Sequence, residues 1–328
     1  MHAGRHYSLR EVALWTRRET LIFLVIATVP TLLYVLAGWT WLTVPWLPIA
    51  LVGTAVAFIT GFKNNASYSR MWEARQIWGA TVNSSRTWGI EVLDYVKAGP
   101  AVHARLIHRH LAWLTALRYQ LREPRKWENL GQAHNVEYRR HYHVAEQESA
   151  LTDELAALIS AEDLAHVLAK KNRATHLIAL QSAELRRLHA DGAIDDFRHI
   201  EMVKLLAEFY DQQGKSERIK NFPYPRQFAT LNLFFVWLFV TLVPFGLLQE
   251  FAELGDHFAW LTIPASVIVA WVFHTMDKIG ESSENPFEGG PNDVPITALC
   301  RTIEIDLREL LGERDVPPAL QAVNDILM

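Results

Sequence analysis

The stretch that decides the fold is residues 49–72, IALVGTAVAFITGFKNNASYSRMW. It begins as a strongly apolar run and continues into charged and amide side chains without a proline. Thr54, Phe58 and Phe62 recur every four residues and Asn65 follows one turn later, so a helix would place them on or near one face. Small residues between them would let neighbouring helices approach closely: Gly53, Ala55, Ala57 and Gly61. The pattern predicts a membrane helix that continues into water, and we expect copies of it to surround a pore.

The polar end of this stretch has a different set of expected roles. Asn64 and Asn65 directly follow the phenylalanines, and their amides can donate to anions or accept from cations, so they suit a site below the constriction where an ion regains water. Asn64 lies off the phenylalanine face and is expected to tie neighbouring helices together. Lys63 and Arg70 are expected to be solvated or to face lipid phosphate rather than to line the pore.

The composition of the 328 residues excludes several classes of protein. The formal net charge of −4 and the absence of a basic face or of any RNA- or DNA-binding motif argue against nucleic acid as a partner. The single cysteine, Cys300, rules out an internal disulfide and is expected to be a small buried apolar residue. No dinucleotide fingerprint, phosphate-binding loop or catalytic motif is present, so we expect neither an enzyme nor a bound cofactor.

Four hydrophobic runs predict membrane-spanning helices, and the first of them, residues 20–38, is close to the roughly 20 residues that a span requires. The first hairpin covers residues 19–62 and lacks a signal-peptide cleavage pattern, so it is expected to be retained. The second covers residues 228–283, and its loop at 249–257 holds acidic residues but no lysine or arginine. By the positive-inside rule this loop lies outside, and the basic segments and both termini lie in the cytoplasm.

The remaining segments are predicted to form a helical cytosolic domain. Residues 1–18 form an amphipathic N-terminus suited to the headgroup region. Residues 63–227 are polar, with apolar residues at helical spacing over five stretches: 72–96, 102–121, 152–168, 174–188 and 194–210. Residues 284–328 hold a Pro/Gly-rich turn, a helix over 297–311 and a short helix after Pro317 and Pro318. The fold class is therefore an all-α membrane protein with four transmembrane helices and a helical cytosolic domain.

Three patches of the sequence resemble the bestrophin family of ion channels, and more particularly its bacterial homologues. They are GFKNNASYSRMWEARQIWG at 61–79, RIKNFPYP at 218–225 and ENPFEGGPNDVPITALCRTIEIDLRELLGE at 284–313. Asn-Pro-Phe directly after a final membrane helix is a mark of the family, and the order and spacing fit from about residue 8 to 313. Residues 123–148 depart from the family pattern and look like a variable insertion.

The resemblance implies a funnel-like homopentamer in the lipid bilayer of the bacterial inner membrane, with one ion pathway on the fivefold axis. It also implies a narrow hydrophobic neck whose positions fall on Thr54, Phe58 and Phe62. Small monovalent ions would pass, with chloride-like anions expected by family precedent. Ring edges that face the axis would favour anions and ring faces would favour cations, so a cation-selective channel stays open, as does a non-conducting membrane scaffold.

Thr54 departs from the family, which usually places a larger apolar residue at this outer neck position. A hydroxyl there would ease hydration and shorten the dry section of the neck to Phe58 and Phe62. The alternative is that the threonine only bonds back to a carbonyl of its own helix.

A second constriction is expected at the cytosolic exit of the pathway, because the family has one there. A gapless match through residues 191–203 puts it at Arg198, and five guanidinium groups would attract anions. A shifted match would put it on one of three apolar residues: Ile194, Ile200 or Met202. Arg198 could instead be an exposed helix arginine that pairs with Asp195.

Calcium binding is not expected, although animal bestrophins bind calcium through an acidic run after Asn-Pro-Phe. Residues 288–293 hold two separated carboxylates, too few for the roughly six to eight oxygen ligands that calcium takes. Asn285 and Asp293 are expected to cap the turn and the helix that follows it. Six histidines are expected to be solvated rather than metal-binding: His103, His108, His110, His134, His141 and His143.

Overall fold

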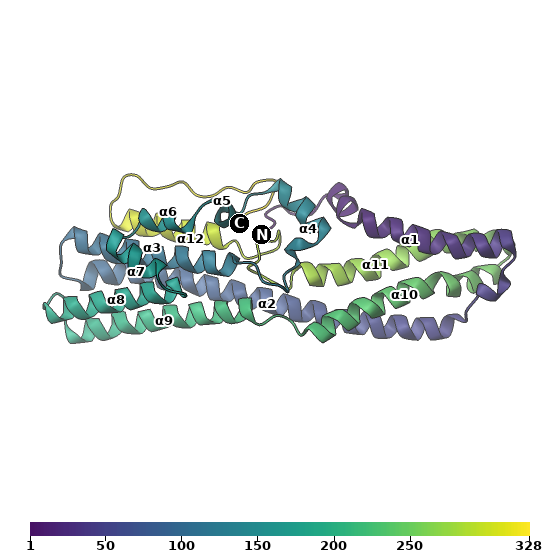
Figure 1. Cartoon of the computed structure of the whole chain (residues 1–328), viewed down its shortest axis with the longest axis horizontal. Coiled ribbons are helices and arrows are strands. Elements are labelled where there is room, and N and C mark those ends of the chain that lie inside the picture. The colour runs from purple at the N-terminus through teal and green to yellow at the C-terminus, as the bar shows by residue number, and fades with distance from the viewer. The chain divides into compact units, whose positions relative to one another are not determined.

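The computed structural model describes residues 1–328, apart from the side chains of His134 and Asp256. Among the described residues all regular elements are helices, and β structure is limited to two isolated bridges. The chain divides into two compact units. The apolar unit comprises Gly4–Ser69 and Pro223–Glu284, and the charged unit comprises Met1–Ala3, Arg70–Phe222 and Asn285–Met328. The predicted all-α fold is confirmed (Figure 1).

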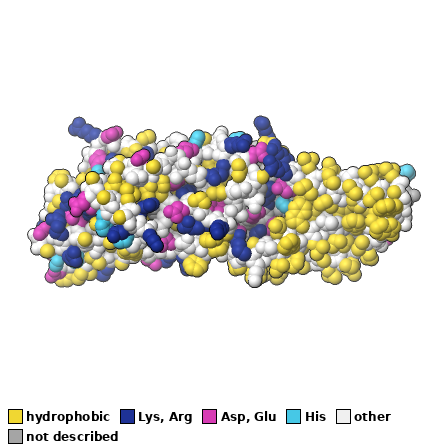
Figure 2. Space-filling view, viewed as in Figure 1, with side chains coloured by type: hydrophobic (Ala, Val, Ile, Leu, Met, Phe, Trp, Pro, Cys, Tyr) yellow, Lys and Arg dark blue, Asp and Glu magenta, His cyan; other side chains and the backbone are white. Residues whose placement is uncertain are grey.

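The apolar unit is built from α1 (Leu9–Ala37), the first part of α2 (Trp46–Tyr95), α10 (Arg226–Glu253) and α11 (Thr262–Ser282). Each of the four helices is long and apolar enough, by length and composition, to span a membrane. The loops between them contain two short 3-10 helices, Thr40–Leu42 and Asp256–Leu261. Helices α1, α10 and α11 pack on one another, and hydrophobic side chains cover the visible surface of this unit (Figure 2).

The ends of α1 follow from local chemistry. Ser8 and Glu11 form a reciprocal capping box, in which each side chain binds a free backbone N–H of the first turn. Gly38 ends the helix with φ +70°, a left-handed conformation that glycine adopts without steric cost. The amphipathic start and the apolar span are therefore one continuous helix.

Helix α2 runs unbroken for 50 residues, as its sequence predicts. Its small residues have two environments. A side chain at Gly53 would place Cβ 2.5 Å from the ring of Phe239, so glycine lets α2 and α10 approach closely. Gly61 has no side-chain neighbour within its own chain, and Ala55 and Ala57 are likewise exposed.

The charged unit contains the rest of α2 with α3 (Pro100–Arg122), α8 (Arg173–Ala190), α9 (Asp196–Asn221) and α12 (Ile296–Leu310). Its core is aromatic at the centre, where Trp88, Trp113 and Phe209 are almost fully buried. Helix α3 begins at Pro100, and Gly192, between α8 and α9, has φ +74°. Helix α3 packs on α8, and α8 packs on α9.

Two expectations about this unit were wrong. The single helix predicted over 152–168 is two, α6 (Leu151–Ala156) and α7 (Ala161–Leu168), because the Ser160 hydroxyl accepts a bond from the Asp163 N–H and starts a new helix. Helix α9 continues past residue 210 to its end at Asn221. The variable tract 123–148 contains four short helices: Asn129–Gly131, α4 (Ala133–Tyr138), Arg139–His141 and α5 (Ala145–Glu148).

The second error is the short helix expected after Pro317 and Pro318, which does not form. This segment is extended and turns at Asn324 and Asp325, which have φ of 49° and 60°. Its backbone pairs with the start of the chain instead. Ala3 N donates to Asp325 O at 2.6 Å, and Leu327 N donates to Met1 O at 2.9 Å.

Candidate ion pathway

The predicted neck residues lie together on one exposed face of α2. Phe58 and Phe62 are 67% and 59% exposed, while Val56 and Thr60 on the opposite side are buried. The two phenylalanine rings are 4.6 Å apart and nearly perpendicular, with an interplanar angle of 87°. Thr54 continues the same face. Large aromatic side chains exposed in an apolar unit must meet lipid, another copy of the chain, or a pore.

The Thr54 hydroxyl bonds back to its own helix. Its Oγ1 donates to Ala50 O at 2.9 Å, as the alternative interpretation of this residue supposed. The hydroxyl proton is therefore occupied, whereas the lone pairs of the oxygen stay on the exposed face. Thr54 thus presents an acceptor to this face and no donor.

Lys63 is neither solvated nor lipid-facing, so that expectation was wrong. Its Nζ donates to Asp277 Oδ1 on α11 at 2.6 Å, and both side chains are buried. Asn232 Nδ2 on α10 donates to the same oxygen at 2.6 Å, and Thr60 Oγ1 donates to Asn232 Oδ1 at 3.1 Å. The buried charge of Lys63 is balanced by the Asp277 carboxylate, which the Asn232 amide also binds. An aspartate at the end of an apolar run was the available sequence signal for this network.

Asn64 and Asn65, which follow Phe62 closely in the sequence, have different surroundings. Asn64 Nδ2 donates to Met276 O on α11 at 3.0 Å, which confirms that Asn64 ties two helices together. Its Oδ1 packs against Gly280, where any side chain would collide with it. Asn65 is exposed on the side of the phenylalanines. Of the two, only Asn65 is exposed.

Arg70 also has a partner that its sequence context did not reveal. Its Nη1 donates to Phe222 O at 2.7 Å and its Nη2 donates to Ile219 O at 2.8 Å. These carbonyls are at the C-terminal end of α9, where helix carbonyls lack partners within the helix. Arg70 therefore closes the end of α9, and the expectation of a solvated or phosphate-facing charge was wrong.

The candidates for the exit constriction differ in exposure. Ile194 and Met202 are buried in the core of the charged unit, so they pack inside their own subunit and do not reach its surface. Ile200 is 51% exposed, and Phe197, which the sequence did not single out, is 84% exposed. Arg198 lies between these two on the first turns of α9.

Arg198 makes the ion pair that its alternative interpretation supposed. Its Nη1 lies 3.2 Å from Asp195 Oδ2, and its backbone N–H donates to Asp195 Oδ1 at 3.0 Å. These contacts lower the pKa of the Asp195 carboxyl. The guanidinium also lies over the Tyr95 ring at 5.6 Å. The side chain is still 38% exposed, so its charge remains open to solvent.

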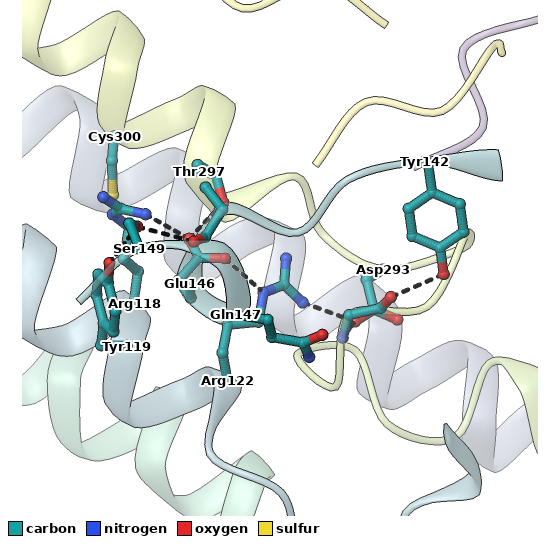
Figure 3. Close-up of polar contacts among 12 residues, drawn as sticks. Arg118, Tyr119, Arg122, Tyr142, Glu146, Gln147, Ser149, Asp293, Thr297 and Cys300 are labelled. Atoms are coloured by element: carbon teal, nitrogen blue, oxygen red, sulfur yellow. Dashed lines mark hydrogen bonds and ion pairs between the residues drawn. The ribbon is translucent and has the colours of Figure 1, made fainter. Parts of the chain in front are cut away.

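The turn after Asn-Pro-Phe is held by hydrogen bonds. Asp293 Oδ2 accepts from Gly289 N at 2.6 Å and from Arg122 Nη1 at 2.9 Å (Figure 3). Glu288 accepts from Asn285 Nδ2 at 3.3 Å and from Asn129 N at 3.1 Å. Asn285 and Asp293 therefore hold the turn as expected. The helix α12 has no side-chain cap, so the second half of that expectation was wrong.

The two carboxylates of this turn lie in a low-dielectric setting. Burial raises the pKa of Glu288 to about 8, and the nearby Asp293 adds to the shift. Burial also raises the pKa of Asp293, against the opposing effect of the Arg122 guanidinium. Among the described side chains no three potential ligands gather in the arrangement that a metal ion needs.

The histidines and the cysteine have separate surroundings. His110 is buried with Nε2 at 2.9 Å from Ser85 Oγ, and burial lowers its pKa to about 3. His108 lies 2.7 Å from Glu313, and His143 lies 2.8 Å from Glu148. His134 falls outside the described side chains. Cys300 is buried, as predicted.

Comparison with known proteins decides the family. The model of the bacterial and fungal bestrophin proteins matches residues 10–309. The chain belongs to the bestrophin family. This bestrophin is 28% identical over 272 residues to the voltage-dependent anion channel-forming protein YneE of Escherichia coli K12, covering 82% of this chain and 78% of that protein. It is 28% identical over 270 residues to RSc3414 of Ralstonia nicotianae, which has the same description, covering 81% and 77%.

Solved structures agree with this assignment. The crystal structure of a bacterial bestrophin homologue from Klebsiella pneumoniae superposes on this bestrophin with a TM-score of 0.77 and 26% identity. The match covers 91% of this chain and 99% of that chain. The bestrophin fold therefore extends over both units of the chain.

Proposed function

We propose that this bestrophin is a homopentameric channel of the bacterial inner membrane that passes small monovalent ions, with anions such as chloride favoured. The exposed pair Phe58 and Phe62 on α2 is the observation that supports the proposal most directly. Fivefold repetition of this face would form a ring of aromatic side chains with Thr54 above it. The names of the relatives in Escherichia coli and Ralstonia nicotianae, which describe anion channel formation, support the choice of anions.

The mechanism follows from the properties of aromatic rings. Apolar walls exclude water and gate by dewetting, while ring edges carry partial positive charge that stabilises an anion stripped of water. Asn65, one turn further on, offers amide donors where the ion regains water. Arg198 is the candidate for the exit, where five guanidinium groups would raise the local concentration of anions.

The proposed orientation follows from charge. The four apolar helices cross the bilayer, and the acidic loop 249–257 faces away from the cytoplasm. The charged unit and both termini then lie in the cytoplasm. An apolar unit with exposed leucine, valine and phenylalanine side chains requires lipid as its solvent.

One alternative has support from specific contacts. Thr54 presents only a hydrogen-bond acceptor to the exposed face. Asp195 offsets the positive charge of Arg198. Both features favour cations more than a pathway lined by hydrogen-bond donors and by arginines without an acidic partner would. The second candidate is therefore a cation-selective channel of the same fold. A non-conducting scaffold, in which Phe58 and Phe62 serve only as subunit contacts, is the third.

Reversal potentials in planar bilayers under a potassium chloride gradient separate these candidates. We expect a potential close to the equilibrium potential of chloride, and a value close to that of potassium would establish the cation channel. Phe58→Ala combined with Phe62→Ala should raise the conductance several-fold, because the dry section of the neck is removed. Phe234→Ala, an equally exposed phenylalanine on α10, is the matched control and should leave conductance unchanged. Absence of flux in all these proteins would leave only the scaffold.

A further inference from the structure

The charged unit contains a cavity of about 440 Å³ that has no part in the proposed pathway. It is bordered by the end of α3, the tract between α4 and α6, and the start of α8. Six charged side chains line it: Arg122, Glu123, Arg139, Glu146, Lys171 and Arg173. Its volume falls within the roughly 300–1,000 Å³ that small-molecule sites occupy.

The two carboxylates in the wall of this cavity are already neutralised. Glu146 accepts from Arg118 Nη1 at 2.5 Å and from Thr297 Oγ1 at 2.6 Å (Figure 3). Glu123 pairs with Arg125 at 3.2 Å. Neither carboxylate is therefore free to balance the cations on the other side of the cavity.

Three of the four cations have no carboxylate partner among the side chains that the structure describes. Arg139 binds only the amide oxygen of Gln147, and Lys171 and Arg173 make no side-chain hydrogen bond or ion pair. The Nε of Arg173 is buried without an acceptor, and so is the Nη2 of Arg122. Buried donors without acceptors are costly, and a concave site with excess positive charge favours an anionic occupant.

We propose that this cavity binds a small multivalent oxyanion that carries phosphate or carboxylate groups. Arginine guanidinium groups present forked donors that match the oxygens of both groups, and Lys171 adds a point charge. Arg173 and Arg139 approach the cavity from separate segments, so an anion with two charged groups can engage both.

Isothermal titration calorimetry on the full-length protein in phosphatidylcholine nanodiscs tests this, with pyrophosphate and citrate as probes. At least one probe should bind saturably, and Arg173→Gln and Lys171→Gln should each weaken that binding by tenfold or more. Arg173→Lys, which keeps the positive charge but loses the forked donors of the guanidinium group, should bind the probe with an intermediate affinity. Lys170→Gln is the matched control, because Lys170 is adjacent to Lys171 but does not line the cavity. All variants should elute with the wild-type protein in size-exclusion chromatography.

Two results would overturn the proposal. One is that neither probe binds saturably. The other is that Lys170→Gln weakens binding as much as Lys171→Gln, which would indicate diffuse attraction to a basic surface. Repeating the titration in nanodiscs that contain phosphatidylglycerol identifies the source of the anion. Weaker pyrophosphate binding there assigns the same site to a lipid headgroup, and unchanged binding assigns it to a soluble anion.

Discussion

Arg198 forms an ion pair while its charge stays partly exposed. Its ion pair with Asp195 lies at the surface, where water screens the charges and such pairs contribute little to stability. The pair therefore leaves the guanidinium partly exposed, and its charge remains open to solvent. Because each arginine is accompanied by an aspartate, the ring that we propose at the exit would favour anions only weakly.

Replacing Arg198 by glutamate tests its place on the pathway. Arg198→Glu should shift the relative permeability toward cations, because it puts two acidic groups where an ion pair stood. Lys204→Glu is the matched control, since Lys204 pairs with Glu201 at the same spacing on the same helix. Reversal potentials measure both variants. If Arg198→Glu leaves the permeability ratio at the wild-type value, Arg198 does not line the exit.

At the level of helices, the contact between α2 and α11 determines which face of α2 points outward. Lys63 and Asn64 are consecutive and bind Asp277 and Met276, which are also consecutive. Successive residues on a helix are rotated by about 100°, so holding these two side chains fixes the rotation of α2 about its axis. Phe62 immediately precedes them and is thereby directed away from α11. The buried ion pair thus fixes which way Phe62 points without contacting its ring.

Breaking this ion pair on one side should destabilise the apolar unit severely. Asp277→Asn leaves Lys63 as a buried charge without a counter-ion, which typically costs about 3–5 kcal/mol. The double variant Lys63→Met with Asp277→Leu removes both charges and should recover much of that loss. Thermal unfolding in detergent, followed by tryptophan fluorescence, measures the difference. Equal melting temperatures for the single and double variants would show that the unpaired charge is not the cause.

Helix bounds and exposed faces were predictable from the sequence where neighbouring residues determine them. The unbroken α2, the start of α3 at Pro100 and the exposed Phe58 and Phe62 all follow from spacing and from residue type. The partner of Lys63 could not be predicted in this way, because it lies on another helix far along the chain. The extended C-terminal segment was missed for the same reason, since its backbone pairs with the start of the chain.

For the whole molecule, the distribution of charge among the segments predicts how the chain is oriented in the membrane. Because the chain has a single cysteine, labelling of introduced cysteines can measure this orientation. Cys300→Ala provides a background without a thiol. Glu250 and Asp153 are both exposed acidic residues, so each replacement by cysteine removes one negative charge. In intact spheroplasts, a membrane-impermeant maleimide should label Glu250→Cys, whereas Asp153→Cys should react only after permeabilisation. The opposite pattern would place the charged unit outside the cell.

The apolar unit is assembled from two segments separated by the whole of Arg70–Phe222. Lys63 and its partner Asp277 are 214 positions apart, which at about 5–20 residues per second corresponds to roughly 10–40 seconds of translation. During that interval the first hairpin is already made, and Lys63 has no counter-ion. The aspartate is thus made only after the whole of Arg70–Phe222, so burial of the lysine charge has to wait for the second hairpin. A nascent chain that stalls before residue 277 therefore retains the charge of Lys63 without its carboxylate partner.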